Sequence, residues 1–150
     1  MLSTVEKVLI LKTVGMFSQT PDDVLADVAD LLVEVDVNPG DRLIAQGEQG
    51  DSLFVIVDGK VRVHDGERLL SYLGERQVFG EMALLDPEPR MASVTAVEPS
   101  RLFRLDQGAF YQLIAERPEV SIGIIHVLTA RLRNLTRDTA PAISSAAENG

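Results

Sequence analysis

The segment Phe79-Gly-Glu-Met-Ala-Leu-Leu-Asp-Pro-Glu-Pro-Arg90-Met-Ala-Ser93 brings a candidate anion-binding residue close to a candidate hydroxyl-binding residue. A carboxylate at Glu81 and a guanidinium at Arg90 would each be costly to bury without a partner. The planar guanidinium can donate to two phosphate oxygens at once, which lysine cannot do. A ligand that offers a hydroxyl to Glu81 and a phosphate to Arg90 would satisfy both groups. This segment therefore predicts a ligand-binding site.

Gly80 comes just before a short helix that we expect over residues 81–85. Glycine allows a ligand to approach the backbone closely, and the amides at the start of such a helix, including that of Ala83, would face an anion. A simpler alternative exists for each residue. Gly80 would be an ordinary turn glycine, Glu81 an acid stabilised by the helix dipole, and Arg90 a solvated loop arginine.

The same residues resemble the phosphate-binding cassette of the cyclic nucleotide-binding domain family. The family pattern is Phe-Gly-Glu-x-Ala-Leu-Leu, a short spacer and Pro-Arg-x-Ala-Thr/Ser, and residues 79–93 reproduce it without insertion. Upstream, Asn38 to Gly47 and Gly50 to Gly59 resemble the turn-and-strand repeats of the same roll. Together the two signatures cover roughly residues 15–135. The resemblance implies a cyclic nucleotide as ligand and a regulatory rather than a catalytic role.

The resemblance also implies roles for individual residues. Arg90 would bind the exocyclic phosphate oxygens, and Glu81 would accept the ribose 2′-hydroxyl. Met91 stands where many relatives carry a small residue or threonine, so it can offer an amide but no hydroxyl, whereas Ser93 occupies the family's Thr/Ser position. This departure favours cAMP over cGMP. The candidate contacts of the cassette are Gly80, Glu81, Met82, Ala83, Arg90, Met91 and Ser93. Asp86 and Glu88 would weaken an anion site beside them.

The purine base requires an apolar groove and a cover. By resemblance, Val63 and Leu73 would line the groove from the roll. The last helix would supply a lid, for which Leu128, Arg131 and Leu132 are candidates, because an arginine can stack on a purine face. Alternatively, the apolar stripe of this helix packs on the roll or on a second copy of the chain, which would make a homodimer.

Composition bounds the class of protein. The chain has 150 residues, enough for one domain, and its hydrophobic share of 45% and charged share of 25% are those of a globular protein. It has no cysteine, and its first apolar run is interrupted by Lys7 and Lys12, which argues against a signal peptide or a membrane-inserted segment. We therefore expect a cytoplasmic location, or the cytoplasmic face of a membrane protein. The net charge of −9 argues against nucleic acid as a partner of this chain.

The pattern of apolar residues predicts a mainly β, α+β fold. Capping signals at Ser3 and at Thr20-Pro21 predict helices over residues 3–12 and 21–32. From Val33 the apolar period alternates, and turn residues separate short strands, which is typical of an antiparallel jelly roll over residues 33–105. C-terminal helices follow over residues 107–137, with Asp106 as a cap and Pro118 as a break. Residues 1–137 would form one domain, and residues 138–150 a disordered tail.

Two other kinds of chemistry find little support. A metal-dependent jelly roll needs clustered histidines with a carboxylate, yet the chain has two histidines, His64 on an expected strand and His126 on a late helix. No nucleophile stands beside a base and an orienting group. We therefore expect a binding module with neither catalytic residues nor a metal.

These observations predict a regulatory module that converts ligand occupancy into movement of its C-terminal helix. Such a module needs an effector domain, and the arrangement of its ends resembles nucleotide-binding domains attached to membrane transporters or channels. Two alternatives remain open. One is the sensor half of a catabolite-activator-type transcription regulator, and the other is a ligand-free interaction or dimerisation domain.

Overall fold

The computed structural model describes residues 1–80 and 89–149, with the backbone alone at residues 127, 131 and 137–149. The chain begins with helix α1 (Thr4–Lys12), whose predicted capping box is confirmed. The amide of Glu6 donates to Oγ of Ser3 over 3.1 Å, and the amide of Ser3 donates to Oε1 of Glu6 over 3.2 Å. This exchange satisfies two amides that an uncapped helix would leave without partners.

A single 3₁₀ turn, η1 (Gly15–Phe17), connects α1 to helix α2 (Asp22–Leu31). The second helix lies where the sequence predicts it, but Pro21 and not Thr20 occupies its N-cap position, and no side chain caps it. Asp22 and Asp23 instead provide negative charge in the first turn, where the positive end of the helix dipole stabilises them.

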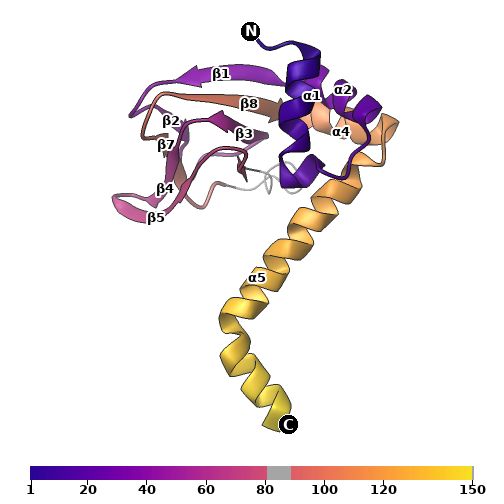
Figure 1. Cartoon of the computed structure of the whole chain (residues 1–150). Helices are drawn as coiled ribbons and strands as arrows, with labels where there is room; N and C mark the ends of the chain where they lie inside the picture. Colours follow the sequence, from indigo (N-terminus) through magenta and orange to yellow (C-terminus); the bar gives the residue numbers. More distant parts are fainter. Residues whose placement is uncertain (81–88, 150) are drawn as a thin grey trace.

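In the described part of the chain, eight strands follow and form two four-stranded antiparallel sheets with the orders β1-β8-β3-β6 and β2-β7-β4-β5 (Figure 1). The predicted antiparallel roll with flanking helices is therefore confirmed. Strand β6 has two residues, too few to show an alternating pattern, so the sequence does not predict it. The strands are β1 (Val33–Val37), β2 (Arg42–Ile44), β3 (Ser52–Asp58), β4 (Val61–Asp65), β5 (Arg68–Leu73), β6 (Val78–Phe79), β7 (Ser93–Ala96) and β8 (Ser100–Asp106).

Strand β3 lies between two separate hydrophobic clusters, which explains why Leu53-Phe-Val-Ile-Val57 is apolar without alternation. Leu53, Val55 and Val57 belong to the cluster that the helices cover. Phe54 and Ile56 belong to the cluster inside the roll. A strand that is buried on both faces cannot alternate between apolar and polar side chains. The helices are thereby fixed to the roll by its central strand.

Pro118 separates helix α4 (Gln107–Glu116) from helix α5 (Val120–Asn149). At this junction, Nε of Arg117 lies 3.0 Å from Oδ2 of Asp27 on α2. Helix α5 contacts η1 and α4 and then runs away from the roll (Figure 1). It continues through residues 138–149, where the sequence predicts a disordered tail.

None of the helices in the described part of the chain is both long enough and apolar enough to cross a bilayer.

Candidate ligand-binding site

The first residues of the predicted site are held by the interior of the roll. Strand β6 pairs with β3, and the ring of Phe79 stacks on the ring of Phe54 with 5.1 Å between centroids. Gly80 follows with a φ of 84°. A Cβ there would lie 2.7 Å from the carbonyl oxygen of Ser52. Both the left-handed backbone and this close approach require glycine, so Gly80 fixes the direction of the chain where it enters the predicted site.

Arg90 is bound to the same part of the roll through its backbone. Its amide donates to the carbonyl of Glu48 over 2.8 Å, and its carbonyl accepts from the amide of Gly47, also over 2.8 Å. Its neighbour Pro89 forms a bridge with Gln49. Arg90 is therefore attached to the loop between β2 and β3, although more than thirty-five positions separate the two segments in the sequence.

The guanidinium of Arg90 folds back onto two main-chain carbonyls. Nη2 donates to the carbonyl of Ser52 over 2.9 Å, and Nη1 donates to the carbonyl of Gly80 over 3.3 Å. Both acceptors are neutral. A guanidinium carries five N–H donors, and among the described residues these are its two hydrogen bonds. It therefore retains donors for an anion, and no carboxylate of the described residues forms an ion pair with it.

Burial has an electrostatic consequence at Arg90. Loss of water around the half-buried guanidinium lowers its pKa, and the negative charge of Asp51 opposes this effect. Arginine stays protonated even so, because its ordinary pKa is far above neutrality. Desolvation therefore makes the cation more receptive to a negative ligand without removing its charge.

A cavity of about 180 Å³ opens beside this guanidinium. This volume is smaller than the roughly 300–1,000 Å³ of typical small-molecule sites. Residues 81–88, which include the predicted contacts Glu81, Met82 and Ala83, lie outside the described part of the chain. The described lining consists of Leu43, Ile44, Ala45, Glu48, Gln49, Gly50, Asp51, Ser52, Phe54 and Arg90.

Sequence reasoning missed the contribution of the β2–β3 loop, which supplies half of this lining. The glycines at positions 47 and 50 were the available signal, because a glycine-rich turn lets the backbone approach another group closely. Gly50 is the clearer case, since a Cβ on it would collide with Nε and Cζ of Arg90. The absence of a side chain at position 50 leaves the space in which the guanidinium lies.

Of the other predicted cassette residues, Ser93 lies near the cavity, whereas the side chain of Met91 lies elsewhere. Ser93 is buried at the start of β7, and its Oγ accepts a 2.9 Å hydrogen bond from the amide of Gln46, next to the cavity-lining Ala45. Met91 is 90% exposed, so its side chain points into solvent. Any contribution of Met91 to the site would come from its backbone.

The predicted groove and lid residues do not meet over the cavity. Val63 and Leu73 are half-buried against the cluster inside the roll, on β4 and β5. Leu128 packs against the cluster beneath the helices, and Leu132 is 65% exposed on α5. The side chain of Arg131 lies outside the described residues. In this structure α5 is therefore not a lid.

Comparison with known proteins decides the family. A family profile described as "Cyclic nucleotide-binding domain" matches residues 34–117, which is more than half of the chain. The chain belongs to the cyclic nucleotide-binding domain family. The matched residues include both the β2–β3 loop and Arg90, the two segments that form the described cavity wall. The family is one of regulatory ligand-binding domains.

Individual relatives agree with this assignment. The chain is 36% identical over 139 residues to a CRP-like cAMP-activated global transcriptional regulator of Mycobacterium tuberculosis, covering 89% of this chain and 62% of that protein. It therefore spans about three fifths of that relative's length. The catabolite activator protein of Thermus thermophilus superposes with a TM-score of 0.76 at 30% identity, over 85% of this chain and 62% of that one.

A third similarity concerns an isolated domain. The N-terminal domain of a transcriptional regulator from Streptomyces coelicolor A3(2) superposes with a TM-score of 0.75 at 30% identity. The match covers 87% of this chain and 94% of that one. The roll and its flanking helices thus correspond to nearly all of a domain whose structure was determined on its own.

Proposed function

We propose that this chain is the sensor module of a regulator and that it binds cAMP in preference to cGMP. The observation that carries the proposal is Arg90, a half-buried cation at the wall of a cavity, bonded to neutral carbonyls. A cyclic phosphate would supply the missing negative charge, and the ribose hydroxyl would bind Glu81 as the resemblance implies. The preference for cAMP rests on Met91, which offers no hydroxyl, and on the first reported relative, which is named as cAMP-activated.

The proposed contacts of the ligand follow the family pattern. Gly80, Met82, Ala83 and Met91 would offer backbone groups to the phosphate. The hydroxyl of Ser93 accepts from Gln46 and still has its own hydrogen to donate. Val63 and Leu73 would contact the base from inside the roll, since both belong to its apolar lining.

Transmission would use the C-terminal helix. Helix α5 contacts η1 and α4 in the present structure, and neither Leu128 nor Leu132 lines the cavity. Bound nucleotide would favour a second arrangement in which α5 covers the base. The ligand can shift this equilibrium only by its difference in affinity for the two arrangements.

The relatives favour the setting of a transcription regulator over that of a membrane transporter. The reported relatives are named as transcription regulators, and this chain covers about three fifths of the first one. We infer that an effector domain acts together with this module, and that the module itself is a binding protein and not an enzyme. The acidic net charge of −9 places any DNA contact in that effector and not in this module.

The test is calorimetric titration of the chain with cAMP and with cGMP. At roughly −0.3 kcal/mol per heavy atom, a ligand of this size is expected to bind with a Kd of about ten micromolar or tighter. Replacing Arg90 with alanine should weaken binding by about 30-fold to several thousand-fold, because the phosphate loses a charged partner. Arg68→Ala, a change of the same type at the β4–β5 hairpin, should leave the affinity unchanged.

Several outcomes would contradict the proposal. Absence of binding at millimolar concentrations of both nucleotides would favour the ligand-free interaction domain. Tighter binding of cGMP would overturn the preference for cAMP. Equal losses in Arg90→Ala and Arg68→Ala would show that Arg90 has no specific role.

A further inference from the structure

The outer face of the sheet β2-β7-β4-β5 carries positive charges that form no ion pair with a carboxylate of the described residues. Arg62 on β4 stands opposite Thr95 of β7 on one side and Tyr72 of β5 on the other, so these side chains share one face. Lys60 lies over the ring of Tyr72, with Nζ 4.4 Å from the centroid. Within the described residues, neither Lys60 nor Arg62 forms an ion pair with a carboxylate.

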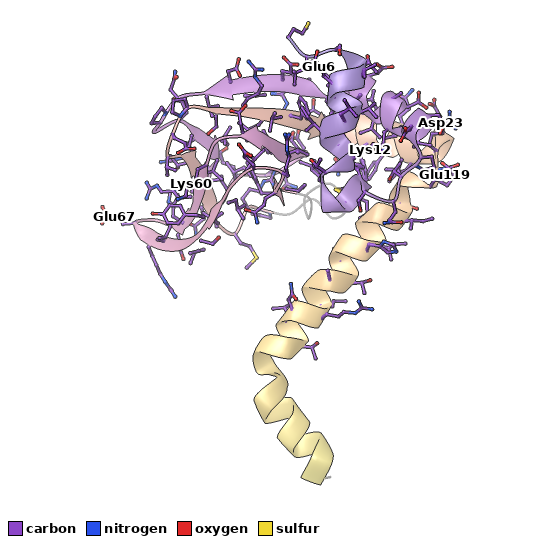
Figure 2. The ribbon with its side chains drawn as sticks, viewed as in Figure 1. Glu6, Lys12, Asp23, Lys60, Glu67 and Glu119 are labelled. Atoms are coloured by element: carbon purple, nitrogen blue, oxygen red, sulfur yellow. The ribbon has the colours of Figure 1, made fainter. Side chains whose placement is uncertain are left out.

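This local charge is unusual for the molecule as a whole, which carries a net charge of −9. Figure 2 shows Lys60 on the roll, at a distance from the acidic residues Glu6, Asp23 and Glu119 around the helices, while Glu67 marks the tip of the β4–β5 hairpin. A basic face on an acidic protein attracts acidic partners and repels basic ones. The positive charge of Lys60 and Arg62 therefore favours an acidic partner for this face.

Strand β5 forms one edge of that sheet and is exposed along most of its length. Its position at the end of the strand order leaves one side without a neighbouring strand in the described part of the chain. Leu69, Leu70 and Tyr72 are 46%, 48% and 50% exposed. An exposed apolar edge is a template for another strand, and proteins commonly protect such edges with lysine or proline. Arg68-Leu-Leu-Ser-Tyr-Leu73 contains neither residue.

We propose that an extended, acidic segment of a partner protein adds to β5 as a fifth strand of this sheet. Its backbone would hydrogen-bond to the free edge of β5, as in other cases of strand addition. Its carboxylates would lie on the face that carries Tyr72 and contact Lys60 and Arg62, and its apolar side chains would lie on the opposite face of the sheet. This surface uses none of the residues that line the cavity beside Arg90.

The experiment measures binding of a fluorescein-labelled synthetic peptide that alternates glutamate and valine over seven residues. Fluorescence anisotropy of this peptide with the full chain should show saturable binding that weakens as salt is added. A peptide with lysine in place of each glutamate should not bind. Arg62→Glu should weaken binding by about tenfold, because attraction becomes repulsion. Arg133→Glu, the same change of charge on α5, should have no effect.

Hydrogen exchange locates the peptide independently of any substitution. The amides of residues 68–73 should exchange more slowly when the glutamate peptide is present, since strand addition gives them new acceptors. Protection confined to another region would overturn the proposal, as would absence of binding or equal effects of the two charge reversals.

Two other occupants are distinguished by the same measurements. If labelled decauridine bound through Arg62 and the acidic peptide did not, the face would recognise nucleic acid and the proposal would be wrong. If residues 68–73 were already protected without peptide, and the chain sedimented as a dimer, a second copy would cover the edge. That result would also overturn the proposal.

Discussion

At the scale of single residues, the site depends as much on a missing side chain as on a charged one. Arg90 supplies the charge, yet its position is set by Gly50, where a Cβ would collide with the guanidinium. The collision involves the end of a flexible side chain, so the fold can avoid it by moving Arg90. The consequence should therefore be a loss of ligand affinity with little loss of stability.

Replacing Gly50 with alanine should weaken cyclic nucleotide binding by about tenfold or more, because Arg90 would lose its bonds to Ser52 and Gly80. The free energy of unfolding of the Gly50→Ala variant should differ from that of the unsubstituted chain by about 0.5 kcal/mol or less. Calorimetry and urea denaturation measure the two quantities. Gly108→Ala is the matched control, because nothing lies within 4 Å of a Cβ there. An affinity equal to that of the unsubstituted chain would contradict the proposed positioning role of Gly50.

At the scale of elements, the start of α5 is fixed against η1 by close backbone packing. A Cβ at Gly123 would collide with the carbonyl oxygen of Met16. Unlike Arg90, this carbonyl belongs to a short helical turn whose neighbour Phe17 is fully buried, so it cannot simply move aside. Nearby, Arg117 joins the α4–α5 junction to α2 through Asp23 and Asp27. The hinge from which α5 would move is therefore anchored to the N-terminal helices.

Replacing Gly123 with alanine should lower the free energy of unfolding by about 1–3 kcal/mol, since overpacking at a rigid contact strains the structure. This loss should outweigh the helix propensity of alanine, which alone would add up to about 1 kcal/mol. Urea denaturation followed by circular dichroism measures the difference. Gly108→Ala in α4 again provides the control and should be neutral or stabilising. A gain in stability at position 123 would mean that α5 does not approach η1 so closely.

At the scale of the whole molecule, α5 carries an apolar stripe that the rest of the chain leaves largely exposed. Ile125, Leu132 and Leu135 are 56%, 65% and 63% exposed, and Leu128 lies between the first two. Successive members are three, four and three residues apart, which is the spacing of a coiled-coil seam. This spacing favours a second copy of the helix as the partner, and we propose a homodimer on this ground.

Sedimentation velocity over a range of concentrations should reveal a dimer of the chain. Leu132→Asp should shift the equilibrium towards monomer by about tenfold or more, because it places a charge in the seam. Asn134→Asp adds the same charge at an exposed position beside the stripe and should have little effect. A chain that is monomeric at every concentration would contradict the proposal. If nucleotide did not change the dimerisation equilibrium, the dimer would favour the interaction-domain alternative for the function of the chain.

The amino-acid sequence by itself determined the fold class and the family, and it predicted Arg90 as a site residue. Alternating apolar residues from Val33 onward and turn residues between them predicted the roll, because the period of two is a local property of strands. The capping box at Ser3 and the break at Pro118 are also local, and both predictions were correct to within a residue or two. Arg90 was identifiable because its neighbours form a contiguous pattern.

The tertiary structure alone decided what lies around these residues. The cavity wall comes from a loop more than thirty-five residues before Arg90, and no local pattern shows that a Gly50 Cβ would meet the guanidinium. The left-handed residue of the β5–β6 turn is Arg76, with a φ of 67°, although Gly74 in the same turn would adopt that conformation without strain. Packing between distant segments sets these positions, and sequence patterns record only neighbours along the chain.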